Sequence, residues 1–174
     1  MASGCQDIRG ITPKILDAND RTAGFCCGEK GIDEFIRKEA LEFQKERLGV
    51  TYLFKLEGEL VGFVTLSMAD LKRAKMNVED RLAIGIENYP ALLIGQLAVC
   101  KEFQAKDVGT FLCDFCLDRA LRFSERVGCR FIVVNAIESA IGFYQKYGFV
   151  LLPDQKDRKQ KIMFLNILSK TLET

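Results

Sequence analysis

Residues Leu92 to Gly109 read LLIGQLAVCKEFQAKDVG, and the rest of the chain can be arranged around them. The apolar part, Leu92 to Val99, is long enough for one buried strand and far too short to span a membrane. A polar stretch follows from Lys101 to Asp107, and Gly109 ends it where an amphipathic helix begins. The first N–H groups of a helix have no internal partner and lie at the positive end of its dipole. This junction therefore predicts an anion site.

The composition is that of one globular domain without a strong overall charge. The chain has 174 residues, 48% of them hydrophobic, and we predict a single domain over residues 1–174. With 25 basic and 24 acidic residues the net charge is +1, so binding to nucleic acid would need a local basic patch. The N-terminus lacks the features of a signal peptide, and no apolar run approaches ~20 residues. A cytoplasmic protein without membrane partners is expected.

The cysteines and the missing histidine restrict the chemistry. The seven cysteines are an odd number without paired CxxC spacings, which argues against a disulfide framework. Cys113 and Cys116 form a single CxxC within a helical pattern, and we interpret them as buried small side chains. No histidine occurs, so histidine-based catalysis is excluded and no metal site is expected. The cysteines are Cys5, Cys26, Cys27, Cys100, Cys113, Cys116 and Cys129.

Hydrophobic periodicity predicts the elements on both sides of the central stretch. Apolar residues at three- and four-residue spacing predict helices, and β-branched or aromatic runs bounded by glycine predict strands. Residues 69–90 show no clean period, and either a solvated connection with a helical turn or a rim that contacts substrate is consistent with them. The predicted elements are a short strand within Ile8 to Leu16, a helix from about Gly31 to Lys45, a hairpin of Thr51 to Leu56 with Leu60 to Ser67, a helix from Thr110 to Val127 closed by Gly128, a strand from Arg130 to Asn135, a helix from about Glu138 to Tyr147 closed by Gly148, and a strand from Lys161 to Leu168. The second of these helices presents an apolar stripe of Leu112, Cys116, Ala120, Phe123 and Val127.

Two runs together resemble the cofactor-binding core of the GNAT superfamily of N-acetyltransferases. They are QLAVCKEFQAKDVGTFL (residues 96–112) and RFIVVNAIESAIGFYQKYGF (residues 130–149). In that family a loop of pattern Q/R-x-x-G-x-G/A binds the pyrophosphate of acetyl-CoA. The resemblance implies an α/β fold with a central mixed, mostly antiparallel sheet flanked by helices, and transfer of an acetyl group from acetyl-CoA to a primary amine. It implies cofactor contacts at Leu97, Ala98, Val99, Gln104, Ala105, Lys106, Asp107, Val108, Gly109 and Thr110.

The second run supplies a catalytic candidate. The family pattern A-x-x-F-Y-x-x-x-G-F is matched here by Ala140, Phe143, Tyr144, Gly148 and Phe149. Because the family tyrosine commonly protonates the departing thiolate, the resemblance implies that Tyr144 is the general acid. A tyrosine hydroxyl, whose ordinary pKa is near ~10, is protonated at neutral pH. The neighbouring Tyr147 is expected to have its hydroxyl in solvent.

The chemistry of acetyl transfer also needs a donor for the developing oxyanion. Where the central strand separates from its neighbour, backbone amides near Leu97 and Val99 would be free to serve. Three residues depart from the family pattern: Asp107 replaces a glycine, Ile137 replaces an asparagine that contacts the cofactor, and Gln96 replaces a glutamate that some relatives use as a base. Either Lys106 offsets the charge of Asp107, or Asp107 points to solvent.

A narrower resemblance concerns FCCGEKGIDEFIRKEALEFQ (residues 25–44). It is similar to the first helix of the acetyltransferase toxins of toxin-antitoxin pairs, which acetylate the amine of aminoacyl-tRNA and are neutralised by a small ribbon-helix-helix antitoxin. The resemblance implies tRNA and antitoxin partners, with a homodimer as a further option. A small-molecule or protein N-acetyltransferase, or a degenerate GNAT domain that binds CoA or a partner without turnover, remains open. The cations available to grip tRNA are Lys72, Arg73, Lys75, Lys156, Arg158, Lys159 and Lys161.

Overall fold

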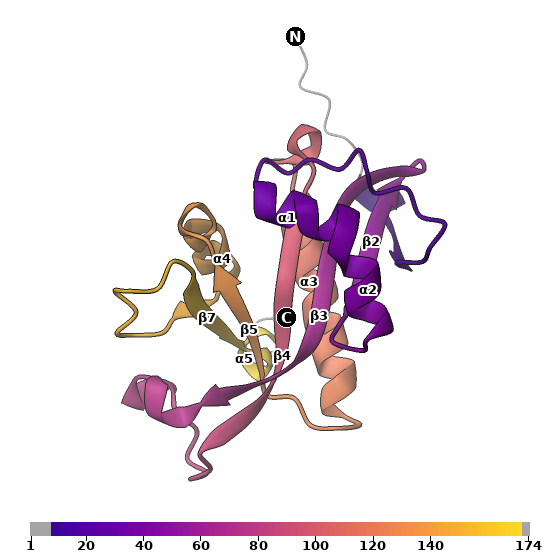
Figure 1. Cartoon of the computed structure of the whole chain (residues 1–174). Coiled ribbons are helices and arrows are strands. Elements are labelled where there is room, and N and C mark those ends of the chain that lie inside the picture. The colour runs from indigo at the N-terminus through magenta and orange to yellow at the C-terminus, as the bar shows by residue number, and fades with distance from the viewer. Residues whose placement is uncertain (1–7, 172–174) are drawn as a thin grey trace. The chain divides into compact units, whose positions relative to one another are not determined.

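The computed structural model describes residues 8–171 (Figure 1), so Cys5 lies outside the described residues. The helices and strands in chain order are β1 (Thr12–Ile15), α1 (Lys30–Glu34), a π-helical turn (Phe35–Glu39), α2 (Ala40–Lys45), β2 (Val50–Leu56), β3 (Glu59–Lys72), β4 (Asn88–Val99), α3 (Val108–Ser124), β5 (Phe131–Ala136), α4 (Ile141–Tyr147), β6 (Val150–Leu151), β7 (Lys161–Asn166) and α5 (Ile167–Thr171). Short 3-10 turns occur at Ile8–Gly10, Arg73–Lys75, Val78–Asp80, Lys101–Phe103 and Glu138–Ala140.

The strands form one sheet in the order β1-β2-β3-β4-β5-β7-β6. The pairs β1–β2, β2–β3, β5–β7 and β6–β7 are antiparallel, whereas β4 and β5 are parallel. Strands β3 and β4 also run in opposite directions, because Cys100 N–H bonds to the Val61 carbonyl while Arg73 N–H bonds to the Glu87 carbonyl. The predicted mixed, mostly antiparallel sheet with flanking helices is confirmed.

The chain divides into two compact units. Unit 1 holds the chain up to Ser67 together with Gly95–Asp114, and unit 2 holds Met68–Ile94 together with the chain from Phe115 onward. Strands β3 and β4 and helix α3 contribute residues to both units. Each unit has a hydrophobic core of its own. The single domain remains a prediction.

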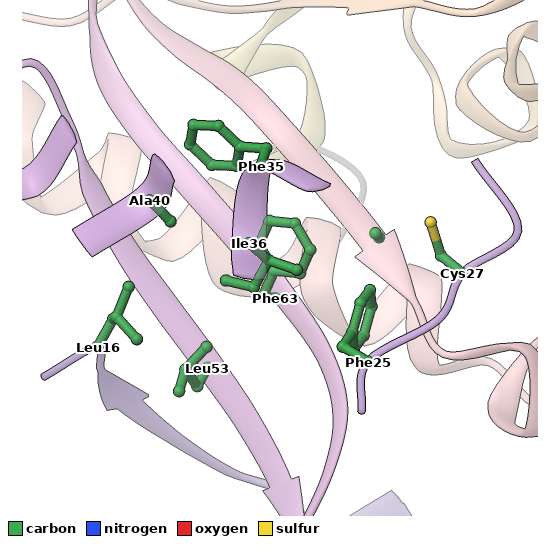
Figure 2. Close-up of a cluster of buried hydrophobic side chains, with 9 residues drawn as sticks. Leu16, Phe25, Cys27, Phe35, Ile36, Ala40, Leu53 and Phe63 are labelled. Atoms are coloured by element: carbon green, nitrogen blue, oxygen red, sulfur yellow. The ribbon is translucent and has the colours of Figure 1, made fainter. Parts of the chain in front are cut away.

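The core of unit 1 lies under the helical run from α1 to α2 (Figure 2). The predicted periodicity is confirmed, since Phe35, Ile36 and Ala40 are all buried. The Phe63 ring stacks on Phe35 at 6.4 Å between centroids, and the Phe25 ring meets Phe63 edge-on at 5.2 Å. Each such buried side chain stabilises the fold by roughly 1.5–3 kcal/mol. The cluster consists of Leu16, Phe25, Cys27, Phe35, Ile36, Ala40, Leu53, Phe63 and Ala98.

The β2–β3 hairpin of unit 1 is confirmed and is closed by a two-residue turn. Glu57 and Gly58 both have positive φ, 51° and 88°, as the tightest hairpin turns require. In the buried pair Thr51–Thr65, which faces across the two strands, the hydroxyl oxygens lie 2.8 Å apart. This pair fixes the register, because each hydroxyl satisfies the other away from water.

The core of unit 2 includes Met76 of the connection between β3 and β4, and Leu82 of the same connection packs against it. Tyr89 packs against Phe131 at 5.3 Å between ring centroids, and its hydroxyl accepts a hydrogen bond from Leu82 N–H at 3.2 Å. The connection contains the predicted helical turn. It packs against the core at Met76 and Leu82, whereas Val78 and Ile84 are exposed. The cluster consists of Leu71, Met76, Tyr89, Ala91, Phe131, Val133, Leu152 and Phe164.

Several predicted boundaries are wrong. Strand β3 continues to Lys72 and β4 already starts at Asn88, because Leu71 and Tyr89 enter the core of unit 2. Helix α3 ends at Ser124, so Val127 lies outside the helix and is exposed, as is Phe123 in the last turn. Strand β7 stops at Asn166, whose side chain accepts a hydrogen bond from Leu168 N–H and so starts α5. Strand β6, with only two residues, was too short to predict.

In the part of the chain that the structure describes, no helix is both long enough and apolar enough to cross a membrane.

Candidate active site

The loop between β4 and α3, within unit 1, leads into the N-terminus of a helix. Ala105 and Asp107 both adopt left-handed backbone, with φ of 56° and 60°. The first helical hydrogen bond runs from Phe111 N–H to the Asp107 carbonyl at 3.0 Å. The N–H groups of residues 108–110 therefore precede the internal bonding of α3 and lie at the positive end of its dipole. Helix α3 has 17 residues, so the position at which the sequence predicts an anion site lies at the start of a full helix, and the site itself stays a prediction.

The side chain of Gln104 anchors this loop to two backbone carbonyls. Its Nε2 donates to the Cys27 carbonyl at 2.8 Å and to the Val99 carbonyl at 3.0 Å. The sequence resemblance placed Gln104 at the cofactor, whereas the structure gives its amide group to the protein backbone. Phe103 is buried beneath the loop, and the Lys106 ammonium lies 5.5 Å from the centroid of its ring. Asp107 is exposed, which agrees with the alternative that its carboxylate points to solvent.

The backbone of β4 presents two of the predicted amides away from β3. Cys100 N–H bonds to Val61 on β3, and successive peptide groups of a strand alternate in direction. The amide of Ala98 therefore also faces β3, and those of Leu97 and Val99 face the opposite edge. The direction of the Val99 carbonyl is consistent with this alternation, because it accepts a hydrogen bond from the Gln104 side chain rather than from a strand. The parallel pairing of β4 with β5 covers Ala91–Ile94 only.

The cysteines near the loop are buried or half-buried. Burial raises the pKa of Cys27 to about 11, so this thiol is protonated at neutral pH. Cys113 and Cys116 are buried with 1% and 0% exposure and lie outside any disulfide, which confirms their interpretation as small core side chains. Among residues 8–171, no three His, Cys, Asp or Glu side chains are grouped as metal ligands.

Tyr144 lies on α4 in unit 2 and is held by two aromatic rings. It is 4% exposed, and its ring meets those of Phe143 and Phe149 edge-on at 5.1 Å and 5.2 Å between centroids. Gly148, with φ of 118°, ends the helix as predicted and returns the chain so that Phe149 packs on Tyr144. Tyr147 is also buried, at 8% exposure, and the exposure of its hydroxyl stays a prediction.

Two contacts of the segment before α1 could not be predicted from the sequence. Asp33 is buried and accepts a hydrogen bond from Cys27 N–H at 2.7 Å, and Arg37 donates to the Phe25 carbonyl through Nε at 3.0 Å. Both residues lie in the stretch for which the apolar periodicity predicts a helix, and that periodicity does not indicate a role for either of them. A signal was present for Asp33, because an acidic residue in the first turn of a helix commonly bonds backbone N–H groups there.

A central strand with free amides at its edge, followed by a loop and a helix N-terminus, defines a class of α/β proteins that bind phosphate-containing ligands. The family model described as the Acetyltransferase (GNAT) family matches residues 14–149. The chain belongs to this family, and the predictions of a GNAT fold and of an acetyltransferase are confirmed.

Individual relatives agree with this assignment. The chain is 27% identical over 147 residues to a "tRNA-acetylating toxin" of Mycobacterium tuberculosis, covering 80% of this chain and 84% of the relative. Its fold is similar to that in a structure of "AtaT complexed with acetyl-methionyl-tRNAfMet", with a TM-score of 0.84, 23% identity, and coverage of 94% and 98% of the two chains. A mutant AtaT toxin bound to the C-terminus of the antitoxin AtaR and acetyl-CoA gives a TM-score of 0.78 at 22% identity, covering 94% and 98%. At these identities the two structures establish the fold.

Proposed function

We propose that this protein transfers the acetyl group of acetyl-CoA to the α-amine of aminoacyl-tRNA and that it acts as the toxin of a cytoplasmic toxin-antitoxin pair. The observation that carries the acetyl-CoA part is the junction of β4, loop and α3 in a chain of the GNAT acetyltransferase family. Support for the tRNA part comes from the relative named a tRNA-acetylating toxin, to which most of the chain is similar. Both units contribute residues to the family match, which supports one functional domain over residues 1–174.

The loop and the start of α3 would hold the pyrophosphate of acetyl-CoA. Amides of residues 108–110 have no helical acceptor, and a phosphate there gains hydrogen bonds and charge complementarity together. Lys106 adds a positive charge beside the loop. Ala105 and Asp107, as left-handed residues, turn the backbone so that the loop can lead into the helix.

The free edge of β4 would serve the reacting end of acetyl-CoA. The amides of Leu97 and Val99 face away from β3, and these two residues are half-buried. Amides with fixed direction polarise a thioester carbonyl and stabilise the oxyanion that forms when the amine attacks. The bond from Gln104 to the Val99 carbonyl fixes the orientation of that edge.

Tyr144 would supply the proton for the CoA thiolate. When the amine attacks, a C–N bond forms, the C–S bond breaks, and the sulfur must gain a proton to leave as a thiol. A phenol held between Phe143 and Phe149 keeps a fixed ring orientation for this donation. The incoming amine loses its proton to solvent. An α-amine is substantially neutral near pH 7–8, so no protein base is obligatory.

Unit 2 carries the cations that would contact tRNA. Lys72 and Lys75 are exposed at the end of β3, and Lys156, Arg158 and Lys159 are exposed in the loop before β7. Lys161 is engaged differently, since its Nζ donates to the carbonyls of Gln155 and Arg158 at 2.6 Å and 2.9 Å. These bonds hold the loop on which Lys156, Arg158 and Lys159 are exposed. The antitoxin partner is inferred from the similar toxin that binds AtaR, and a homodimer remains a further proposal.

The experiment that tests the function uses the full chain with radiolabelled acetyl-CoA. Charged tRNA, the same tRNA uncharged, and the free amino acid are offered as acceptors, after acetyl-CoA binding has been measured by isothermal titration. We expect acetyl-CoA to bind and label to transfer to the charged tRNA only. Transfer to the free amino acid alone would contradict the tRNA part, and binding without transfer would favour a degenerate domain.

A Gly109→Val variant serves as the binding control. A side chain at Gly109 obstructs the close approach of a phosphate to the backbone, so this variant should lose acetyl-CoA affinity. Full affinity in a folded Gly109→Val protein would show that the pyrophosphate binds elsewhere.

A further inference from the structure

A buried carboxylate in unit 1 holds the backbone on which the loop rests. Asp33 is 6% exposed, and its Oδ1 accepts a hydrogen bond from Cys27 N–H at 2.7 Å. Burial raises the pKa of Asp33, but hydrogen bonds from Cys27 and Gly28 outweigh burial and hold this pKa below its usual range. The side chain is therefore charged at neutral pH. A buried charge that is bonded to backbone N–H groups fixes the course of that backbone.

The backbone that Asp33 holds is the Phe25–Gly28 segment, whose other side bonds to the loop. The Cys26 carbonyl accepts from Lys101 N–H at 2.9 Å, and the Cys27 carbonyl accepts from the Gln104 side chain at 2.8 Å. The N–H of Cys27 thus bonds to helix α1 while its C=O bonds to the loop. A continuous path of hydrogen bonds joins Asp33 to Gln104 through a single residue.

Two further contacts make this segment rigid. Arg37 donates to the Phe25 carbonyl, and the Phe25 ring packs on Phe63 in the core of unit 1, where Figure 2 shows Phe25 and Cys27 on the same stretch of chain. Gly28 has φ of 101°, and a Cβ there would lie only 2.7 Å from Lys101 Cε. That atom is the flexible end of the Lys101 side chain, so it is the left-handed backbone that favours glycine at this position.

We propose that Asp33 is a positioning residue for acetyl-CoA binding, acting through Cys27 and Gln104 on the loop at the start of α3. The inference rests on the proposed function, because it concerns the same acetyl-CoA site. Asp33 itself touches the backbone of the Phe25–Gly28 segment. Without its carboxylate the N–H of Cys27 lacks a partner, the segment relaxes, and Gln104 loses the fixed acceptor that holds the loop.

The experiment is a double-mutant cycle on acetyl-CoA affinity, measured by isothermal titration with the full chain. Asp33→Ala and Gln104→Ala are each expected to weaken binding about 5- to 50-fold, because each breaks the same path. The double variant should then lose clearly less affinity than the product of the two single losses, and should bind about as tightly as the more impaired single variant. A role limited to capping the helix would lower stability and leave affinity and coupling unchanged.

Asp20→Ala is the matched control. The Asp20 carboxylate is also buried in unit 1 and accepts a hydrogen bond from a backbone N–H, that of Asp17. Asp20 is far from the loop in sequence. The variant should lose stability and keep acetyl-CoA affinity within about twofold. If Asp33→Ala does not fold, Asp33→Asn, which keeps an acceptor oxygen without the charge, takes its place in the cycle with a smaller expected loss.

Unchanged affinity in the Asp33 variants, or fully additive losses with Gln104→Ala, would overturn the inference while the proposed function stands. A parent protein that does not bind acetyl-CoA would overturn both.

Discussion

Asp107 combines a strained backbone with a charge beside the anion site. Its φ of 60° lies in the region that glycine adopts freely and aspartate tolerates. The carboxylate is exposed, so its repulsion of a pyrophosphate is reduced by solvent and by salt. We expect Asp107→Gly to tighten acetyl-CoA binding, more at low than at high ionic strength, in titrations at two salt concentrations. Asp107→Asn separates the two effects, because it removes the charge and keeps the left-handed preference; weaker binding in both variants would mean that the carboxylate holds the loop.

Tyr144 is tested by removing a single hydroxyl. Tyr144→Phe keeps the ring between Phe143 and Phe149, so stability and acetyl-CoA affinity should hardly change. Turnover should fall roughly 10²- to 10⁴-fold, the usual contribution of a positioned general acid. Tyr147→Phe is the control, and its burial makes it a closer match than a surface tyrosine would be. Acetyl transfer by Tyr144→Phe within a few-fold of the parent would leave solvent as the proton source.

Asp20 should make the stability of unit 1 depend on acid pH. Burial raises the pKa of Asp20, but bonds from Lys14 and Lys55, each at 2.7 Å, and from the Asp17 amide outweigh burial and lower it to about 2. Because the folded pKa is below the unfolded value of 3.8, this stabilisation is present above about pH 4 and is lost as the pH falls through 2. It amounts to ~2 kcal/mol.

Urea unfolding of the parent and of Asp20→Asn at pH 6 and pH 2 measures this contribution. The variant should be less stable at pH 6, and the two proteins should converge at pH 2. An equal difference at both pH values would show that Asp20 stabilises the loop by its shape rather than by its charge.

Motifs predicted which residues form the loop, but they could not predict where each side chain points. Gln104 belongs to the motif, and its side-chain amide donates a hydrogen bond to the Cys27 carbonyl, 77 residues earlier in the chain. Such a contact depends on the packing of α1 against the sheet, which no local pattern encodes. The burial of Asp33 could not be predicted either, because a single buried charge does not disturb the apolar periodicity around it.

At the scale of elements, α4 depends on the residue that ends it. Gly148 has φ of 118°, and a Cβ there would lie 3.2 Å from Lys170 Cε, the flexible end of a side chain. Gly148→Ala should therefore cost about 1–2 kcal/mol, mainly from backbone strain, and lower the Tm by several degrees. Gly142→Ala, on the same helix with nothing within 4 Å of the added carbon, is the control and should be neutral or stabilising. Equal Tm values for the two variants would contradict the strain.

Long elements with a clear period were predictable, and their ends were not. The helix over residues 31–45 and the hairpin follow from spacing and turn chemistry alone. The π-helical turn at Phe35–Glu39 leaves no sequence signal, because the buried set of Phe35, Ile36 and Ala40 also fits a regular α-helix. The sequence predicts that strand β3 ends at Ser67, because the last five residues of the observed strand mix charges with apolar residues. Leu71 becomes a core residue only through the partners that unit 2 brings to it.

At the scale of the whole molecule, the net charge of +1 gives no general attraction for RNA. The proposed tRNA contact must then come from a local group of cations, and the loop before β7 exposes such a group. Gln155 bonds the Leu152 and Ile162 carbonyls through its side chain, and Lys161 bonds the loop's own carbonyls. Lys156 and Lys159 are exposed on the loop that these bonds hold.

Reversing those two charges tests whether position or total charge matters. We expect Lys156→Glu with Lys159→Glu to raise the KM for aminoacyl-tRNA by about 10- to 100-fold and to reduce its salt dependence, because two phosphate contacts are lost. Acetyl-CoA affinity should not change, since neither lysine belongs to the loop before α3. The control reverses Lys38 and Lys45, exposed lysines of the helical run in unit 1. Each reversal removes two units of charge, so both double variants go from +1 to −3. Equal losses in the two variants would mean that tRNA responds to overall charge, whereas a loss confined to the first assigns the contact to the loop before β7.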